Sequence, residues 1–309
     1  MNYQLKKNTT RLCLLAFAIL AGMQIGCGTS LHNDNQQVVL AKSICTITDS
    51  NPLQGFLDEA SGIEIDKNGL LWAINDQGNS NDVFCFDSDG ILLKKIKIDD
   101  SKNIDWEDLT LDQKDNLYIG NFGNNENDRK NLSIYKIKDF SSIDKKHVKS
   151  KKIEFSFQNQ KKFPPKETKM HFDVEAFFAY KDSLYLFSKD RSTPFEGITN
   201  LYKLPTKKGE YKATFLSTFY TSPYSYEGRI TAADISSDGS KVILLAEDVI
   251  YYFTDFQFPD IFGGVMEQIP LPVKRQFEGA VFGKDDEIYL VNEIAYGEAV
   301  HLMRIDFCK

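Results

Sequence analysis

The chain has 309 residues, of which 42% are hydrophobic and 13% aromatic, so it can bury a sizeable core and is not a disordered protein. Its formal net charge of −7 at pH 7 argues against binding of nucleic acid or an anionic membrane through a basic face. Aromatic and β-branched residues fall in short runs, which favours strands over helices.

The N-terminal residues 1–26 have the organisation of a secretory signal peptide. Three basic residues precede an apolar stretch at 12–25, which is shorter than the roughly 20 residues that span a bilayer. A small residue directly before Cys27 resembles the lipobox of bacterial lipoproteins, in which the cysteine carries the lipid. Gln24 stands where the lipobox usually has leucine, so an ordinary signal peptide is the alternative. We expect lipidation at Cys27.

Cleavage before Cys27 would remove three positive charges and take the net charge from −7 to −10. Residues 27–37 are then the lipidated cysteine and a polar tether, and 38–309 are expected to form one domain. The predicted location is the bacterial cell envelope, on the outer membrane or the periplasmic face. The lipid is the only membrane attachment that we expect, and we predict a monomer that binds no nucleic acid.

One pattern recurs five times from residue 59 onward. A short apolar strand begins beside an acidic residue, a turn rich in Asp, Asn, Lys and Gly follows, and a second strand comes after the turn. Further strands complete most repeats, such as 82–87 and 91–97 in the first. Repeats of about 40–50 residues with four strands each are typical of β-propeller blades. The second strands begin at residues 71, 117, 184, 242 and 288, with spacings of 46, 67, 58 and 46.

The two ends of the repeat region complement each other. The last repeat has only one further strand, 301–307, and the segment 38–45 is a strand without a repeat of its own. An N-terminal strand that completes the last blade would remove an exposed edge. The predicted fold is therefore all-β, a propeller of five four-stranded blades whose ring is closed by the N-terminal strand. Six blades are the alternative, because the spacing of 67 could contain a degenerate unit.

Three cysteines follow Cys27, and this odd number argues against a disulfide framework. If strands 38–45 and 301–307 run antiparallel, Cys45 lies near residue 300 and Cys308 near residue 37, too far apart for a disulfide. We therefore expect Cys45, Cys85 and Cys308 to be free or buried.

Carboxylates recur at the start of the first strand of each repeat. In a propeller these strands line the central channel, and residues two apart along a strand point the same way. Two such charges 4 Å apart repel by about 4 kcal/mol at an effective dielectric constant of about 20, so a ring of them needs a cation, protons or solvent. Hard oxygen donors without a His or Cys cluster favour Ca²⁺ or Mg²⁺. The predicted metal ligands are Glu59, Asp105, Glu107, Asp173, Glu175 and Glu278.

Two alternatives accompany these site predictions. The acidic residues could instead cap turns or pair with surface lysines. A second polar set follows the second strands, and its densest loop is 120–129, in which Arg129 could contact a phosphate or a carboxylate or could be a solvated surface arginine. The predicted ligand-binding residues are Asn75, Asp76, Asn121, Asn124, Arg129, Asp190, Arg191, Asn292 and Glu293.

Four short motifs lie at 106–109 (Trp-Glu-Asp-Leu), 120–129, 134–137 and 230–239. Together they resemble the bacterial β-propeller lipoproteins called SdiA-regulated or phytase-like (esterase-like), and the resemblance covers most of 56–309. It implies an extracytoplasmic propeller, Ca²⁺ in the channel and, for some members, hydrolysis of phosphate or carboxylic esters. Six blades are typical of the phytase-like members.

We expect a binding module whose acidic, Ca²⁺-occupied channel mouth faces a small anionic ligand or an envelope protein partner. The alternative is a metal-dependent hydrolase of phosphate or carboxylic esters, with Glu107 or Glu175 as the base. The candidates for a cationic group near the leaving charge are Arg129, Lys189 and Arg191. A second alternative is a structural envelope lipoprotein. No Gly-x-Ser-x-Gly, His-Glu-x-x-His or Cys-x-x-Cys motif occurs, so the sequence leaves catalysis open.

Overall fold

The computed structural model describes residues 37–39, 44–53, 55, 57–284, 287–295 and 299–308, all within the compact unit of residues 32–309. The predicted signal peptide, the lipidation site Cys27 and all but the last residue of the tether lie outside the described residues. Within the described part of the chain, no helix combines the length and the apolar character that a membrane crossing requires.

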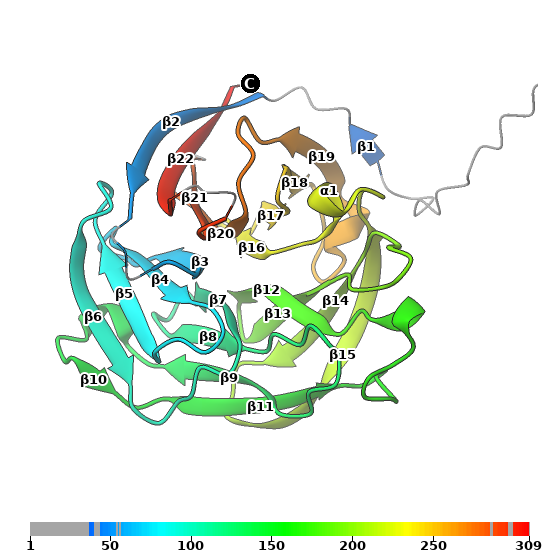
Figure 1. The fold of residues 1–309 in the computed structure, drawn as a ribbon, viewed down its shortest axis with the longest axis horizontal. Coiled ribbons are helices and arrows are strands. Elements are labelled where there is room, and N and C mark those ends of the chain that lie inside the picture. The colour runs from blue at the N-terminus through cyan, green and yellow to red at the C-terminus, as the bar shows by residue number, and fades with distance from the viewer. Residues whose placement is uncertain are drawn as a thin grey trace, which may run out of the picture. The chain divides into compact units, whose positions relative to one another are not determined.

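Five four-stranded antiparallel units follow one another along the chain (Figure 1). Unit 1 contains Ala60–Ile65 (β3), Leu71–Asn75 (β4), Asp82–Phe86 (β5) and Leu92–Ile98 (β6). Unit 2 contains Trp106–Leu111 (β7), Leu117–Asn121 (β8), Leu132–Ile137 (β9) and Lys151–Phe157 (β11). Unit 3 contains Asp173–Tyr180 (β12), Ser183–Lys189 (β13), Ile198–Pro205 (β14) and Gly209–Tyr220 (β15).

Unit 4 contains Ala232–Ile235 (β16), Val242–Leu245 (β17), Val249–Thr254 (β18) and Val265–Pro270 (β19). Unit 5 contains Phe277–Phe282 (β20), Ile288–Asn292 (β21), His301–Cys308 (β22) and, from the other end of the chain, Ile44–Pro52 (β2). The described helices are short. They are Phe140–Ser142 (η1), Glu167–Lys169 (η2), Ser225–Gly228 (α1) and Ile261–Gly263 (η3).

The outer edges of the units are also paired. Gln37–Val39 (β1) runs parallel to β19, and His147–Val148 (β10) runs parallel to β6. The last strands of units 2 and 3, β11 and β15, pair in parallel, so these two units form one eight-stranded sheet. Such pairing covers strand edges that could otherwise recruit another chain.

The first strands of the units contact one another in a closed cycle, β3 to β7 to β12 to β16 to β20 and back to β3. One hydrophobic cluster fills each interface between neighbouring units; for example, Trp72 of unit 1 packs with Trp106 of unit 2. This accounts for the high aromatic content, because large rings fill the wedge between two twisted sheets. The described strands therefore form a ring of five units around a channel.

Asx-type turns connect the first two strands of several units. In unit 1, Asp66 Oδ1 accepts hydrogen bonds from the backbone N–H groups of Asn68 and Leu70, at 2.8 and 3.1 Å. Gly69 completes this turn with φ +80°, a conformation that glycine adopts without steric cost. Asp112 forms the same turn in unit 2. Residues 66–69 are thus one of the turns rich in Asp, Asn, Lys and Gly that the repeat pattern predicts between the first two strands.

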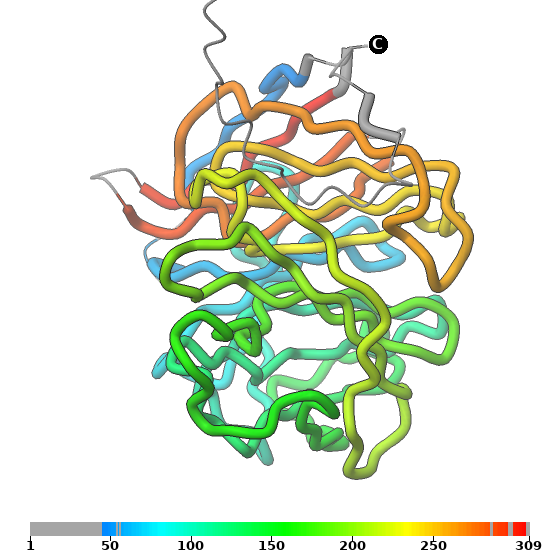
Figure 2. The backbone as a smooth tube through the Cα atoms, turned by 90° about the vertical axis from the view of Figure 1, so that its right-hand side faces the viewer, coloured from blue at the N-terminus to red at the C-terminus, as the bar shows by residue number. Residues whose placement is uncertain are grey.

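The ring is closed by antiparallel pairing of β2 with β22, and Figure 2 shows these two segments, blue and red, running side by side. The closing strand is 44–52 rather than 38–45, because residues 37–39 pair with β19 of unit 4 instead. Cys45 is therefore opposite Phe307 and Cys308 opposite Ile44, so the prediction that the two cysteines lie at opposite ends was wrong.

The prediction of free or buried cysteines is confirmed for Cys45, which is buried, and for Cys85, which is free and buried. The Cys45 thiol donates a hydrogen bond to the carbonyl of Pro270 at 3.1 Å. Burial raises the pKa of the Cys85 thiol to about 12, so this thiol is inert at neutral pH.

Candidate functional site

The five inner strands run in the same direction through the ring. At the starts of β3 and β7, the Ser61 hydroxyl donates a hydrogen bond to the carbonyl of Glu107. At the ends of the same two strands, the N–H of Leu111 donates to the carboxylate of Glu64 at 2.7 Å. All five strand starts therefore meet at one mouth of the channel and all five ends at the other. We call the first the acidic mouth, because its lining includes Asp76, Asp105, Glu107, Asp173, Glu175, Glu278 and Glu293.

Three carboxyl groups converge at the acidic mouth. Asp76 directly follows β4, Asp105 directly precedes β7, and Glu107 lies in β7. One oxygen from each lies within 4.8 Å of the others. Gly123 makes this approach feasible, because a Cβ atom there would overlap the carboxyl groups of Asp105 and Glu107. We call Asp76, Asp105 and Glu107 the carboxyl triad.

The triad has little compensating positive charge. Arg129 Nη1 lies 3.5 Å from Asp105 Oδ2, but the guanidinium also donates to the carbonyls of Gly123 and Asn121. Among the described residues, Glu107 has no ion pair within 4 Å, although only 5% of it is exposed. Burial, with further contributions from Glu175 and Asp76, raises the pKa of Glu107 well above its usual value. Burial likewise raises the pKa of Asp76 to about 7.

A second pair, Asp173 and Glu175, is bound by cations. Arg191 donates to Asp173 and to Glu175, at 2.6 Å each, and Lys189 Nζ lies 2.5 Å from Glu175 Oε2. Burial would raise the pKa of Glu175, but Lys189 and Arg191 outweigh it and lower that pKa. Asp173 has only one of the two cations, and burial together with the charge of Glu175 raises its pKa to about 7. Glu175 is therefore the ionised member of the pair.

The remaining carboxyls of the acidic mouth belong to unit 5. The Gln276 side-chain amide donates to both Glu278 and Glu293 and holds the two together. Burial raises the pKa of Glu278 to about 8, against the opposing effect of Lys189. Glu59, also predicted as a metal ligand, is exposed and accepts a hydrogen bond from Asn79. The structure thus brings Asp105 and Glu107 together with Asp76, and pairs Asp173 and Glu175 with cations.

Several predicted ligand-binding residues are engaged in organising loops. Asn121 Oδ1 accepts from the backbone N–H of Asp105 at 3.1 Å, and the backbone N–H of Asn124 donates to Asp173 at 2.5 Å. Asn292 Oδ1 accepts from the N–H of His301 at 3.0 Å. These side chains and backbone groups position the carboxylates, and a direct role in ligand binding stays a prediction.

Asp190 is also committed to its own loop. Its carboxylate accepts from the N–H groups of Ser192 and Ile198, at 2.8 and 3.1 Å, and lies 3.2 Å from His171. Burial opposes ionisation, but these partners outweigh it and lower the pKa of Asp190 to about 2. A carboxylate held in this way is a structural acceptor.

No family model and no curated protein matches the chain. Among solved structures, the chain is similar to a PQQ-bound aldose sugar dehydrogenase from Streptomyces coelicolor, with a TM-score of 0.51 and 9% identity over 87% of this chain and 99% of that one. The fold is a β-propeller. A gluconolactonase from Xanthomonas campestris has a TM-score of 0.43 and 11% identity, over 80% of this chain and 72% of that one.

A virginiamycin B lyase from Staphylococcus aureus has a TM-score of 0.40 and 14% identity, and 80% of this chain matches 66% of the length of that protein. At 9% identity the likeness to the sugar dehydrogenase concerns the fold alone, and the chemistry has to be argued from the side chains.

Sequence reasoning missed two contributors to the propeller's acidic mouth. Asp76 was assigned to ligand binding, whereas its carboxyl lies beside Asp105 and Glu107 of the next unit. The signal for this lay in the order of the repeats, because the loop after the second strand of one unit faces the inner strand of the next. Gln276 precedes β20, and nothing in the local sequence indicated that its amide bridges two carboxyls.

Proposed function

We propose that the carboxyl triad holds a divalent cation, Ca²⁺ in preference, and that the acidic mouth binds a ligand through it. The observation that carries the proposal is the approach of three carboxyl oxygens to within 4.8 Å. One of them belongs to the buried Glu107, which forms no ion pair with any described residue. Without a cation or bound protons, this arrangement would be strongly repulsive.

The donor set fits a hard cation. All three side chains offer carboxylate oxygens, as Ca²⁺ and Mg²⁺ prefer, and no His or Cys belongs to the group. Asp76 is partly exposed while Asp105 and Glu107 are buried, so the triad opens toward solvent on one side. When bound, the ion would supply positive charge and coordination positions for a ligand.

The charges around the triad indicate what kind of ligand would bind. Arg129, Lys189 and Arg191 all already contact carboxylates of the mouth. An anionic ligand would therefore meet its main attraction at the cation held by the triad, and not at a free arginine. We accordingly propose a cation-dependent binding module for a small anionic ligand or an acidic segment of an envelope protein. The resemblance of the sequence before Cys27 to a lipobox supports placing it in the cell envelope.

Ester hydrolysis is the second candidate function. A buried carboxyl with a raised pKa at a channel mouth is typical of general acid–base residues. Glu107 has this property, whereas Glu175, the other candidate base, has both oxygens in ion pairs with Lys189 and Arg191. The structure therefore favours Glu107 over Glu175 as the base of such an enzyme.

The test is thermal unfolding of the full mature chain in EDTA and then in increasing Ca²⁺ or Mg²⁺. If the site is specific, the unfolding midpoint rises with cation concentration. At a free cation concentration of one hundred times the dissociation constant, the free energy of unfolding increases by about 2.7 kcal/mol. Asp76→Asn and Glu107→Gln should abolish the response. Glu59→Gln, an exposed carboxyl outside the triad, is the matched control and should keep it. A wild-type unfolding midpoint that does not change with either cation would refute the proposal.

The same preparations separate the two candidate functions. Turnover of phosphate monoesters and short acyl esters that requires the cation and is lost in Glu107→Gln would establish a hydrolase. Cation binding without any turnover would leave the binding module.

A further inference from the structure

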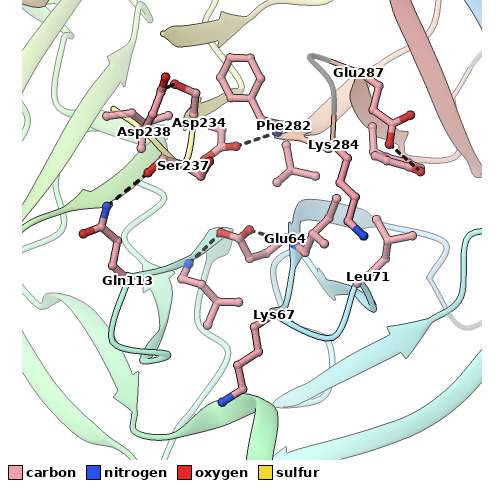
Figure 3. Close-up of a pocket in the computed structure, with 18 of the residues that line it drawn as sticks. Glu64, Lys67, Leu71, Gln113, Asp234, Ser237, Asp238, Phe282, Lys284 and Glu287 are labelled. Atoms are coloured by element: carbon pink, nitrogen blue, oxygen red, sulfur yellow. Dashed lines mark hydrogen bonds between the residues drawn. The ribbon is translucent and has the colours of Figure 1, made fainter. Parts of the chain in front are cut away.

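The other mouth of the channel contains a cavity of about 1120 Å³, formed where the inner strands end (Figure 3). Its lining includes Glu64 and Ile65 of β3, Leu111 of β7, Asp234 of β16 and Phe282 of β20. No residue of the carboxyl triad lines it. The cavity is therefore separate from the acidic mouth, and its volume is that of a small-molecule site and far exceeds that of an ion.

Two buried carboxyl groups are directed into this cavity from opposite walls, as Figure 3 shows for Glu64 and Asp234. Each residue is only 8% exposed. Glu64 accepts from the N–H of Leu111 at 2.7 Å, and Asp234 accepts from the N–H of Phe282 at 2.8 Å. Neither has a cationic partner within 4 Å among the described residues, and the two repel each other.

Three lysines line the cavity, Lys67, Lys241 and Lys284. The Lys67 ammonium lies 2.7 Å from Asp115, and among the described residues none of the three forms an ion pair within 4 Å with either of the two carboxyls. The walls also include apolar groups, among them Leu71, Val281 and the ring of Phe282. A ligand that fits has to offer a positive charge to the two carboxyls and an apolar body to the walls, because uncompensated buried carboxylates are costly.

We propose that this second mouth binds a small organic amine, with its ammonium group between Glu64 and Asp234. The backbone N–H donors from the neighbouring units hold both carboxyl groups in place before the ligand arrives, which lowers the entropic cost of binding. The site uses no residue of the acidic mouth, so its existence does not depend on the proposed function there.

Calorimetric titration of the full mature chain tests the proposal, with 1,4-diaminobutane as the probe and 1,4-butanediol as an uncharged probe of similar length. We expect saturable binding of the diamine and none of the diol. The double variant Glu64→Gln/Asp234→Asn should weaken binding by about thirtyfold or more, because it removes the charge at a buried contact. Asp182→Asn, at an exposed carboxyl that does not line the cavity, and Glu107→Gln, at the other mouth, should bind as the wild type does.

Three results would overturn the proposal. The first is the absence of saturable diamine binding, and the second is binding that persists in the double variant. The third is a cavity that binds Ca²⁺ but not the diamine, with the Ca²⁺ binding abolished in Glu64→Gln/Asp234→Asn. That result would make the cavity a metal site. If circular dichroism shows that the double variant is unfolded, Asp234→Asn alone takes its place with the same expected direction.

Discussion

Gly123 lies against the carboxyl groups of Asp105 and Glu107, and a side chain of any size at this position would overlap them. The sequence marked the loop 120–129 as rich in polar residues, but the local pattern did not indicate a steric role for a glycine. That role depends on the inner strand β7 passing behind the loop, which only the folded chain reveals.

We expect Gly123→Ala to displace Asp105 or Glu107 and to abolish the Ca²⁺-dependent rise in unfolding temperature. Stability in EDTA should fall by about 1–3 kcal/mol, the usual cost of overpacking a buried site. Gly55→Ala is the matched control, because its added Cβ would meet only Asp58 at 3.8 Å. An unchanged Ca²⁺ response in Gly123→Ala would show that the triad is not the cation site.

At the scale of elements, the inner strands are joined by side-chain acceptors as well as by packing. Asp108 of β7 accepts from the N–H of Phe177 in β12 at 3.0 Å, and Thr231 donates to the carbonyl of Phe277 in the next unit at 2.8 Å. Adjacent inner strands are too far apart for a continuous backbone ladder, so buried carboxyls and hydroxyls satisfy the N–H and C=O groups left between units.

Asp108→Ala should therefore lower the free energy of unfolding by about 2 kcal/mol, because the N–H groups of Phe177 and Leu109 lose their acceptor in a buried place. Asp108→Asn keeps an acceptor oxygen and should cost less than about 1 kcal/mol. Urea unfolding measures both, with the exposed Asp182→Ala as a reference. Equal losses in the alanine and asparagine variants would rule out this role for the carboxyl oxygen.

The closing strand shows why one element was misplaced. Residues 38–45 are mostly apolar and read as a strand, whereas 46–52 contain Thr, Asp, Ser, Asn and Pro and read as a turn. In the structure β2 is the outermost strand of unit 5, and its exposed face accommodates these polar residues. The alternation of exposed and covered side chains along an outer strand predicts a strand less strongly than a run of apolar residues does.

At the scale of the whole molecule, the number of repeats, the inner strands and the acidic character of one mouth could be predicted from the sequence. These features depend on local patterns that recur in every unit. Which carboxyl meets which cation could not be predicted, because Asp76 and Glu107 come from different units and Arg191 reaches back to Asp173 and Glu175 across a hairpin. The cavity at the second mouth depends on the ends of four inner strands, β3, β7, β16 and β20, at once.

Buried carboxyls also determine the pH dependence of stability. Burial raises the pKa of Asp173 and Asp234 to about 7 and of Glu278 to about 8, whereas unfolded carboxyls titrate near pH 4. Between pH 4 and pH 7 to 8, the folded chain binds more protons at these groups than the unfolded chain does. Their contribution to stability is therefore complete below about pH 4 and is lost as the pH rises through 7 to 8.

In EDTA, we therefore expect the unfolding midpoint to fall as the pH is raised from about 5 to 8. Asp234→Asn should reduce this slope, because it removes one of the titrating groups. Added Ca²⁺ should oppose the fall, because it stabilises ionised carboxyls at the acidic mouth. A midpoint in EDTA that climbs over this pH interval would contradict the protonation states described above.

The parallel pairing of β11 with β15 has a mechanical consequence. Units 2 and 3 contact each other through their inner strands and again through their outer strands, so we expect these two units to move together. Any breathing that widens the channel is left to the remaining seams. Asp76 and Glu293 face each other across the seam between units 1 and 5, and Glu64 and Asp234 lie on opposite walls with unit 5 between them. We expect such motion to change the separations within these two pairs.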